Sequence, residues 1–183
     1  MPLSNRQEGV ILRKITWALL AAGMTFAASA APASAATTGS ETFRGAIVTT
    51  GVSGTRTVIS SVVLAQGVYR GVGRIVEIDN LPTDPDNVSR DDLVFPGGSM
   101  HLVSTSLDFI SSVNPDTCVA KVEIPQTGRI VGGTGRFAHA SGSSSATVRA
   151  FAILVRNRDG SCPFDQATLY EVDLVNSTGT LSL

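Results

Sequence analysis

Carboxyl groups that suit acid and base chemistry occur in this sequence as pairs on predicted strands. Glu77 with Asp79, and Glu171 with Asp173, each place two carboxyl groups on one strand face, because alternate residues of a strand share a face. Such neighbours lie roughly 6.6 Å apart along the strand, a spacing that suits a general acid beside a general base. We nevertheless predict that the pairs face water, and the apolar residues that alternate with Glu171 favour this interpretation directly.

Nucleophile and metal chemistry lack their usual patterns in this chain. A serine with His101 or His139 and an aspartate supplies the residue types of a hydrolase, but the sequence has no Gly-x-Ser-x-Gly turn to expose the serine. Four aspartates lie in the stretch 80–98 without the central glycine or closing glutamate of a calcium loop. We interpret that stretch as a long solvated loop, and we expect no metal and no cofactor. The four aspartates of this stretch are Asp84, Asp86, Asp91 and Asp92.

A glycine-rich stretch, residues 128–142, is the most specific pattern in the sequence. Glycine adopts positive φ angles and permits close backbone approaches that a Cβ makes costly. We therefore predict a structural corner in a β-sheet here. A phosphate-binding loop is disfavoured, because the stretch lacks the lysine and the strand-to-helix context of such loops. The predicted corner consists of Gly132, Gly133, Thr134, Gly135 and Gly142.

The first 35 residues have the pattern of a secretory signal peptide. Arg13 and Lys14 precede an apolar run over 15–28, and small residues end at Ala35 with the spacing that signal peptidase requires. Cleavage after Ala30 is the alternative. The apolar run is shorter than the roughly 20 residues of a membrane span, so we expect no membrane anchor. The sequence therefore predicts a secreted, extracellular protein.

Residues 36–183 have the size of one domain with a single core. The whole chain has a formal net charge of −1, and the leader holds more basic than acidic residues, so its removal makes the remainder more acidic. Nucleic acids and anionic membranes bind basic surfaces. We therefore expect neither as a partner.

Cys118 and Cys162 are the two cysteines of the chain. In an oxidising compartment we expect them to form a disulfide, which stabilises a fold by about 4 kcal/mol when it closes a loop of this length. A nucleophilic or metal-binding thiol is the alternative, but two lone cysteines lack the spacing of a ligand set.

Beyond the leader the sequence predicts an all-β fold. Short runs of β-branched and small residues are separated by glycine, proline and aspartate, and helical periodicity is almost absent. Antiparallel strands joined by short turns form either a β-sandwich or a closed barrel. Gly71 and Gly73 permit strong curvature, which favours a single antiparallel eight-stranded barrel. The predicted strands are 41–50, 55–65, 68–79, 99–112 as one bent strand or two, 118–124, 146–156 and 167–175, with a hairpin turn at 51–54.

The segment Ile130-Val-Gly-Gly-Thr-Gly-Arg-Phe137, with Ala140 and Gly142 after it, resembles the signature of the plant dirigent proteins. It is similar, more loosely, to the allene oxide cyclases, which share an eight-stranded β-barrel. Pro96-Gly-Gly-Ser99 and Asp116-Thr-Cys118 are similar to segments of secreted bacterial relatives of that barrel. The resemblance covers roughly the second half of residues 36–183, and it implies a barrel with an apolar cavity.

A small barrel of this kind holds one ligand between apolar walls and a few polar groups. On the last predicted strand we expect Thr168, Tyr170, Val172 and Leu174 to point inward, which makes Tyr170 the first candidate for the pocket. The further candidates lie on strands whose interior face the sequence does not reveal. They are His101, Arg74, Glu77 and Tyr69.

We expect a secreted barrel that holds a small apolar ligand. If the protein is an enzyme, the barrel guides a cyclisation, isomerisation or coupling by confinement, without a cofactor. The alternative is a non-catalytic extracellular structural or protein-interaction module. A cavity of about 300 Å³ or more with Tyr170 in its wall favours the ligand hypothesis, and a filled interior beside an exposed apolar patch favours the alternative. A homo-oligomer is compatible with the sequence, which does not set the number of subunits.

Overall fold

The computed structural model describes residues 36–51, 55–163 and 168–183. The predicted signal peptide, with both cleavage positions, and residues 52–54 of the predicted hairpin turn lie outside the described residues. Among the residues described, no helix is long and apolar enough to cross a bilayer.

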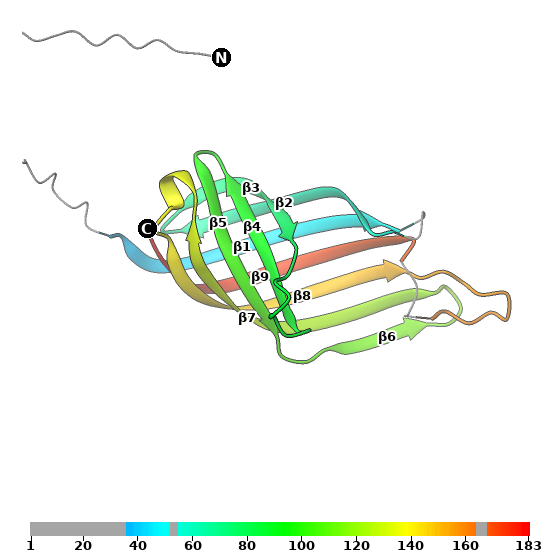
Figure 1. Ribbon diagram of the computed structural model, residues 1–183. Coiled ribbons are helices and arrows are strands. Elements are labelled where there is room, and N and C mark those ends of the chain that lie inside the picture. The colour runs from blue at the N-terminus through cyan, green and yellow to red at the C-terminus, as the bar shows by residue number, and fades with distance from the viewer. Residues whose placement is uncertain (1–35, 52–54, 164–167) are drawn as a thin grey trace, which may run out of the picture. The chain divides into compact units, whose positions relative to one another are not determined.

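The described part of the chain consists of β-strands and one short 3-10 helix, η1 (Figure 1). This confirms the all-β prediction. The elements in chain order are β1 (Thr38–Thr50), β2 (Thr57–Gly67), β3 (Arg70–Ile78), β4 (Val88–Phe95), β5 (Gly98–Ser106), β6 (Ile110–Asn114), β7 (Val119–Gly133), η1 (Gly135–Phe137), β8 (Ser141–Ile153) and β9 (Tyr170–Ser182).

Eight of these strands close into an antiparallel barrel. The sheet runs in the order β5-β4-β3-β2-β1-β9-β8-β7-β6, and β5 also pairs with β7. The ladder from Leu102↔Ile130 to Ser106↔Gln126 makes that closure, so the sheet forms a ring. The predicted barrel is confirmed, and a β-sandwich is excluded. Strand β6 is not part of the ring (Figure 1). It pairs only with β7, at Val119–Glu123, whereas β5 pairs with the later part of β7, from Gln126 to Gly133.

The stretch 80–98, which we predicted as irregular, contains strand β4. Leu93 and Phe95 of this strand are buried and alternate with less buried residues, as expected for a strand with one face toward a core. The stretch 99–112 forms two strands, β5 and β6. Strands β7 and β8 both extend into the glycine-rich stretch, so the bend there is shorter than predicted.

The glycine-rich corner connects β7 to β8 and seals one end of the barrel. A Cβ on Gly133 would lie 2.1 Å from the carbonyl oxygen of Ser99, and Gly135 has a φ of 56°. The Thr134 hydroxyl accepts the backbone N–H of Ser99 at 3.0 Å, which fastens the corner to the start of β5. Phe137, on the turn that follows, is fully buried. The prediction of a glycine-dependent corner is therefore confirmed.

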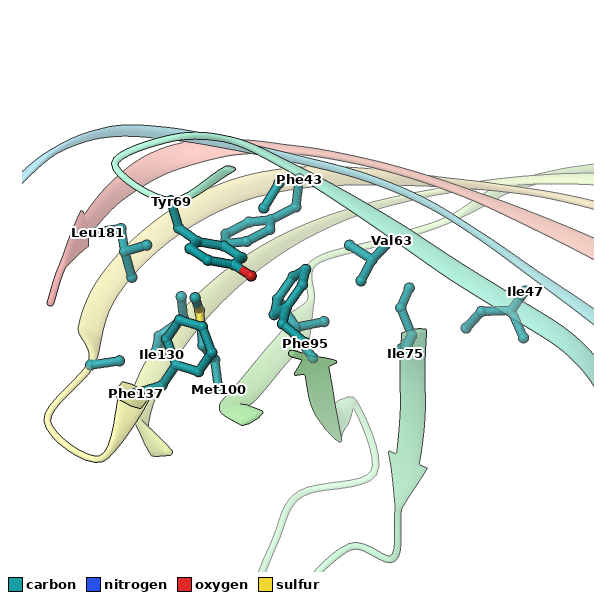
Figure 2. Close-up of a cluster of buried hydrophobic side chains, with 13 residues drawn as sticks. Phe43, Ile47, Val63, Tyr69, Ile75, Phe95, Met100, Ile130, Phe137 and Leu181 are labelled. Carbon is teal, nitrogen blue, oxygen red and sulfur yellow. The ribbon is translucent and has the colours of Figure 1, made fainter. Parts of the chain in front are cut away.

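Three aromatic rings fill the barrel at this end (Figure 2). Tyr69, in the β2–β3 turn, has its ring 4.9 Å from that of Phe95 and 5.0 Å from that of Phe137, both in edge-to-face geometry. The Arg136 guanidinium lies 5.3 Å from the Tyr69 ring centroid. Met100 and Leu181 are fully buried beside the rings. We call Tyr69, Phe95, Met100, Phe137 and Leu181 the aromatic end.

A second, smaller core surrounds the disulfide. Cys118 and Cys162 are bonded, with their Cα atoms 5.4 Å apart, as predicted from the sequence. Ala120 of β7, Ala152 of β8 and Leu154, which follows β8, are buried against them at the ends of these strands farthest from the glycine corner. The bridge therefore ties the loop that carries Cys162 to the start of β7.

Candidate functional site

The interior of the barrel contains a cavity of about 440 Å³. Alternate residues of each strand point inward, and the glycine and small residues among them leave space that the larger side chains do not fill. The middle of the cavity has a mainly apolar wall with serine hydroxyls on one side. The apolar lining consists of Phe43, Ile47, Val63, Ile75, Leu93, Leu102, Ile130, Ala146, Val148 and Val175, and the polar residues between them include Ser104, Gln126, Ser144 and Ser177.

Tyr170 does not line this cavity. Its side chain is 42% exposed on the outer face of β9, and the residues of β9 that line the cavity include Asp173, Val175 and Ser177. The predicted inward set was therefore wrong. Both faces of β9 carry apolar residues: Val175 lies on the inner face, and Leu174 lies on the exposed outer face. Alternation along the strand therefore did not show which face lies inside.

The other predicted pocket residues divide between three environments. Glu77 lines the cavity. Tyr69 is buried in the aromatic end, with its ring packed against Phe95 and Phe137. His101 and Arg74 point away from the interior, since Met100, Leu102 and Ile75 occupy the inward positions beside them. His101 Nδ1 contacts an Asp92 carboxylate oxygen at 2.6 Å on the outer face.

The end of the cavity opposite the aromatic end is lined by carboxyl groups. Glu77 and Asp91 are cross-strand partners in the β3–β4 ladder, and Asp173 enters from β9 with only 8% of its surface exposed. Arg56 forms an ion pair with Glu77 and a longer one, at 3.4 Å, with Asp173. We call Arg56, Glu77, Asp91 and Asp173 the acidic end.

The acidic end reaches solvent where strands β2 and β3 separate. Their ladder ends at Val63↔Gly73, and beyond it the Ser61 hydroxyl accepts the Ile75 N–H at 2.7 Å and donates to the Ile75 carbonyl at 2.6 Å. Past this contact, the Arg56–Glu77 ion pair connects the two segments, and each of these side chains is 40% exposed. A solute therefore meets charged groups at this end of the cavity first.

Burial changes the acidity of two of these carboxyl groups. Burial, followed by the nearby charge of Glu77, raises the pKa of Asp91 from 3.8 to about 6. Burial, followed by the charge of Glu171, raises the pKa of Asp173 from 3.8 to about 7, and the charge of Arg56 offsets part of this rise. The acidic end therefore holds carboxyl groups that gain and lose protons near neutral pH.

Glu41 lines the cavity at its aromatic end. It is 2% exposed, and its Oε2 accepts the backbone N–H of Tyr69 at 2.8 Å. Its other oxygen, Oε1, is buried and has no hydrogen-bond partner among the residues that the structure describes. Buried polar atoms are nearly always hydrogen-bonded, so an unpaired oxygen beside a cavity suggests a place for a ligand donor.

Our prediction that the Glu171–Asp173 pair faces water was wrong for Asp173. Asp91 and Glu41, which line the cavity, and Arg56, which pairs with two of its acids, were not among the predicted residues. A usable signal existed for the acids, because Asp91 shares a strand face with Leu93 and Phe95, and Glu41 shares one with Phe43 and Ile47. An acid in register with large apolar residues points toward a core.

Searches of the chain against protein-family models, curated proteins and solved structures find no match. The class of protein therefore follows from the coordinates. It is a closed eight-stranded antiparallel β-barrel with an internal cavity that is apolar in the middle and acidic at one end.

Proposed function

We propose that this protein is a secreted barrel that holds one small, largely apolar molecule in its interior. The observation that carries the proposal is the cavity of about 440 Å³, which lies within the range of about 300–1,000 Å³ of known small-molecule sites. Its walls combine large apolar side chains with a few polar groups, as such sites do.

The frame around the cavity suits a preformed site. The aromatic end is packed, the glycine corner is fastened to β5, and a disulfide holds the loop beyond the acidic end. A rigid site avoids the cost of ordering side chains when a ligand binds. This supports binding without large rearrangement.

Should the ligand react inside the barrel, two features would favour one product. The walls restrict the conformations that a flexible molecule adopts, which lowers the entropy that the reaction must overcome. Asp91 and Asp173, with pKa values of about 6 and about 7, can each donate or accept a proton near neutral pH. Both features support a cyclisation, isomerisation or coupling that uses no cofactor.

The test is binding of a neutral apolar probe, N-phenyl-1-naphthylamine, to variants that do or do not fill the cavity. Ala146→Phe adds a ring from the inner face of β8. Ala46→Phe makes the same change at a residue of β1 that does not line the cavity. We expect saturable fluorescence enhancement at one probe per chain for the parent and for Ala46→Phe, and at least tenfold weaker binding for Ala146→Phe.

Equal probe binding by a correctly folded Ala146→Phe variant would contradict the proposal. Circular dichroism and thermal unfolding establish that both variants are folded. Native mass spectrometry of protein purified from its own culture medium gives an independent check, since a retained small molecule appears as a mass difference.

A second candidate function rests on the outer face of the barrel. Leu174, Ala46 and Val62 are direct cross-strand neighbours on β9, β1 and β2, and Leu174 and Val62 are exposed. Phe151, Ile153 and Tyr170 extend the exposed apolar surface along β8 and β9. A continuous patch of this kind is typical of a protein-interaction surface. It therefore supports a role as an interaction module, including self-association.

Light scattering tests this second function. If the patch joins copies of the chain, the parent protein has a multiple of the monomer mass and Leu174→Lys returns it to monomer. A monomeric parent at high concentration rules out self-association through this surface.

A further inference from the structure

We propose that the cavity selects an apolar molecule that carries a protonated amine, with the ammonium group among Glu77, Asp91 and Asp173 and the apolar body toward the aromatic end. This inference rests on the proposed function, because it names the class of ligand that the same cavity takes.

The charge balance of the acidic end carries the inference. Arg56 is the only cation whose ion pairs reach these acids among the residues described, and it is shared between Glu77 and Asp173. Among these described residues, Asp91 forms no ion pair. The cluster thus holds more negative than positive charge, and an added cation stabilises it.

The raised pKa values of the two buried acids agree with this charge balance. Burial is the main cause for both, the charge of Glu77 adds to it at Asp91 and that of Glu171 at Asp173, and Arg56 offsets only part of the rise. Each carboxyl group therefore keeps its proton to a higher pH than a free aspartate does. A ligand ammonium supplies the missing charge and displaces those protons.

Glu41 provides an independent second contact. Its unpaired Oε1 is buried at the aromatic end of the cavity and accepts a hydrogen bond from a donor group on the ligand. Along β1, Glu41 is separated from Ile47, the cross-strand partner of Asp173, by six residues, or roughly 20 Å of strand. An elongated molecule therefore reaches both acids, whereas a compact one reaches one of them.

Two other occupants fit less well. A carboxylate ligand would add a negative charge beside three acids. The two arginines near them are already paired, Arg56 with Glu77 and Asp173, and Arg90 with Asp84. A metal ion needs several ligands at short, fixed distances, and no group of three or more His, Cys, Asp or Glu side chains in the described part of the chain is arranged to hold one.

The experiment compares three ligands that share one apolar chain and differ in the head group: dodecylammonium, dodecanol and dodecanoate, each below its critical micelle concentration. Calorimetry on the mature protein at pH 7 measures affinity. We expect dodecylammonium to bind at least tenfold tighter than dodecanol and dodecanoate to bind weakest. Titrations in buffers of different ionisation enthalpy should show proton release with the amine and none with the alcohol.

Variants separate the acidic end from general surface charge. The double variant Asp91→Asn with Asp173→Asn should lose the preference for the amine and keep its affinity for dodecanol. Glu123→Gln removes one carboxylate from an exposed pair with Arg149 and should keep the preference. Glu41→Met removes the acceptor oxygens at the other end and should weaken binding of a ligand with a terminal hydroxyl group, such as 12-aminododecanol, relative to dodecylammonium.

The outcomes distinguish this inference from the proposed function. If dodecanol binds one to one and the amine binds no tighter, the cavity holds apolar ligands and the inference is wrong. If the Asn double variant still prefers the amine as strongly as the parent does, the acidic end is not the ammonium site. If none of the three ligands binds, the proposed function itself fails.

Discussion

The two ends of the barrel interior differ in what fills them. At the aromatic end, Tyr69, Phe95 and Phe137 pack ring against ring beside the fully buried Met100 (Figure 2). At the acidic end, Glu77, Asp91 and Asp173 line the cavity, and the exposed ion pair of Arg56 with Glu77 lies at its mouth. Strands β4 and β9 contribute residues to both ends.

This difference separates stability from function within one small barrel. Burial of aromatic rings contributes favourable free energy, since apolar surface leaves water and the rings attract one another. Burial of carboxyl groups without enough counter-charge opposes folding. A protein keeps such groups where a ligand makes use of them. Here Glu77, Asp91 and Asp173 lie where the cavity opens, and Glu41 lines the cavity at its other end.

The largest effect is expected at the aromatic end. Phe137→Ala removes a fully buried ring that touches Tyr69 and Arg136, and it should lower the free energy of unfolding by about 3–5 kcal/mol. Phe109→Ala is the matched control, because Phe109 is 63% exposed, and its change should stay below about 1 kcal/mol. Urea titration followed by circular dichroism measures both. Equal losses would mean that the aromatic end is not the stabilising core.

Loss of the disulfide beyond the acidic end should have the next largest effect. Replacing Cys118 and Cys162 together by serine frees a loop with a sequence separation of 44 residues, and it should destabilise the protein by about 2–4 kcal/mol. The cavity is lined by other residues, so probe binding should persist below the unfolding transition. Thermal unfolding with and without a reducing agent checks the stability, and N-phenyl-1-naphthylamine fluorescence checks the cavity.

The acidic end should give the protein an unusual dependence of stability on pH. The folded-state pKa values of Asp91 and Asp173 lie above the unfolded value, so the folded protein binds more protons in this range. The free energy of unfolding should therefore fall as the pH rises from about 4 to about 7, by about 1–3 kcal/mol for Asp173, and should level off above that.

Asp173→Asn isolates this contribution. The variant should flatten the fall between about pH 4 and pH 7 and should be at least as stable as the parent at pH 8, where the parent buries a charged carboxylate. Glu123→Gln, on an exposed residue, should leave the slope unchanged. A parent protein that becomes more stable as the pH rises through this window would contradict the assigned burial of the two acids.

The smallest effect should come from the outer face of β9. Tyr170→Ala removes an exposed side chain that does not line the cavity, and it should change the free energy of unfolding by less than about 1 kcal/mol. Binding of the neutral probe should stay within a factor of two of the parent. A large loss of probe binding would return Tyr170 to the cavity wall and contradict the strand orientation described above.

Much of the fold could be predicted because local chemistry dictates it. The glycines at 133 and 135 stand where a Cβ would collide with backbone, so their spacing alone indicated a tight corner. Strand β4 was missed because its charged and proline-flanked sequence is similar to that of a loop. The site was harder to predict. Glu77 was named, and Tyr170 was placed on the wrong face. Arg56 lay in a predicted strand but received no role, because the acids that it pairs with come from distant parts of the sequence.

The amino-acid sequence by itself determined that the chain is all-β, that it bends sharply after Ile130, and that its two cysteines pair, since turn glycines and alternation act over a few residues. The tertiary structure alone decided which face of each strand lies inside. That choice depends on ring closure through β5 and β7, which brings Asp91 and Asp173 from strands far apart in sequence to one end of a single cavity. Their raised pKa values are a property of that enclosure.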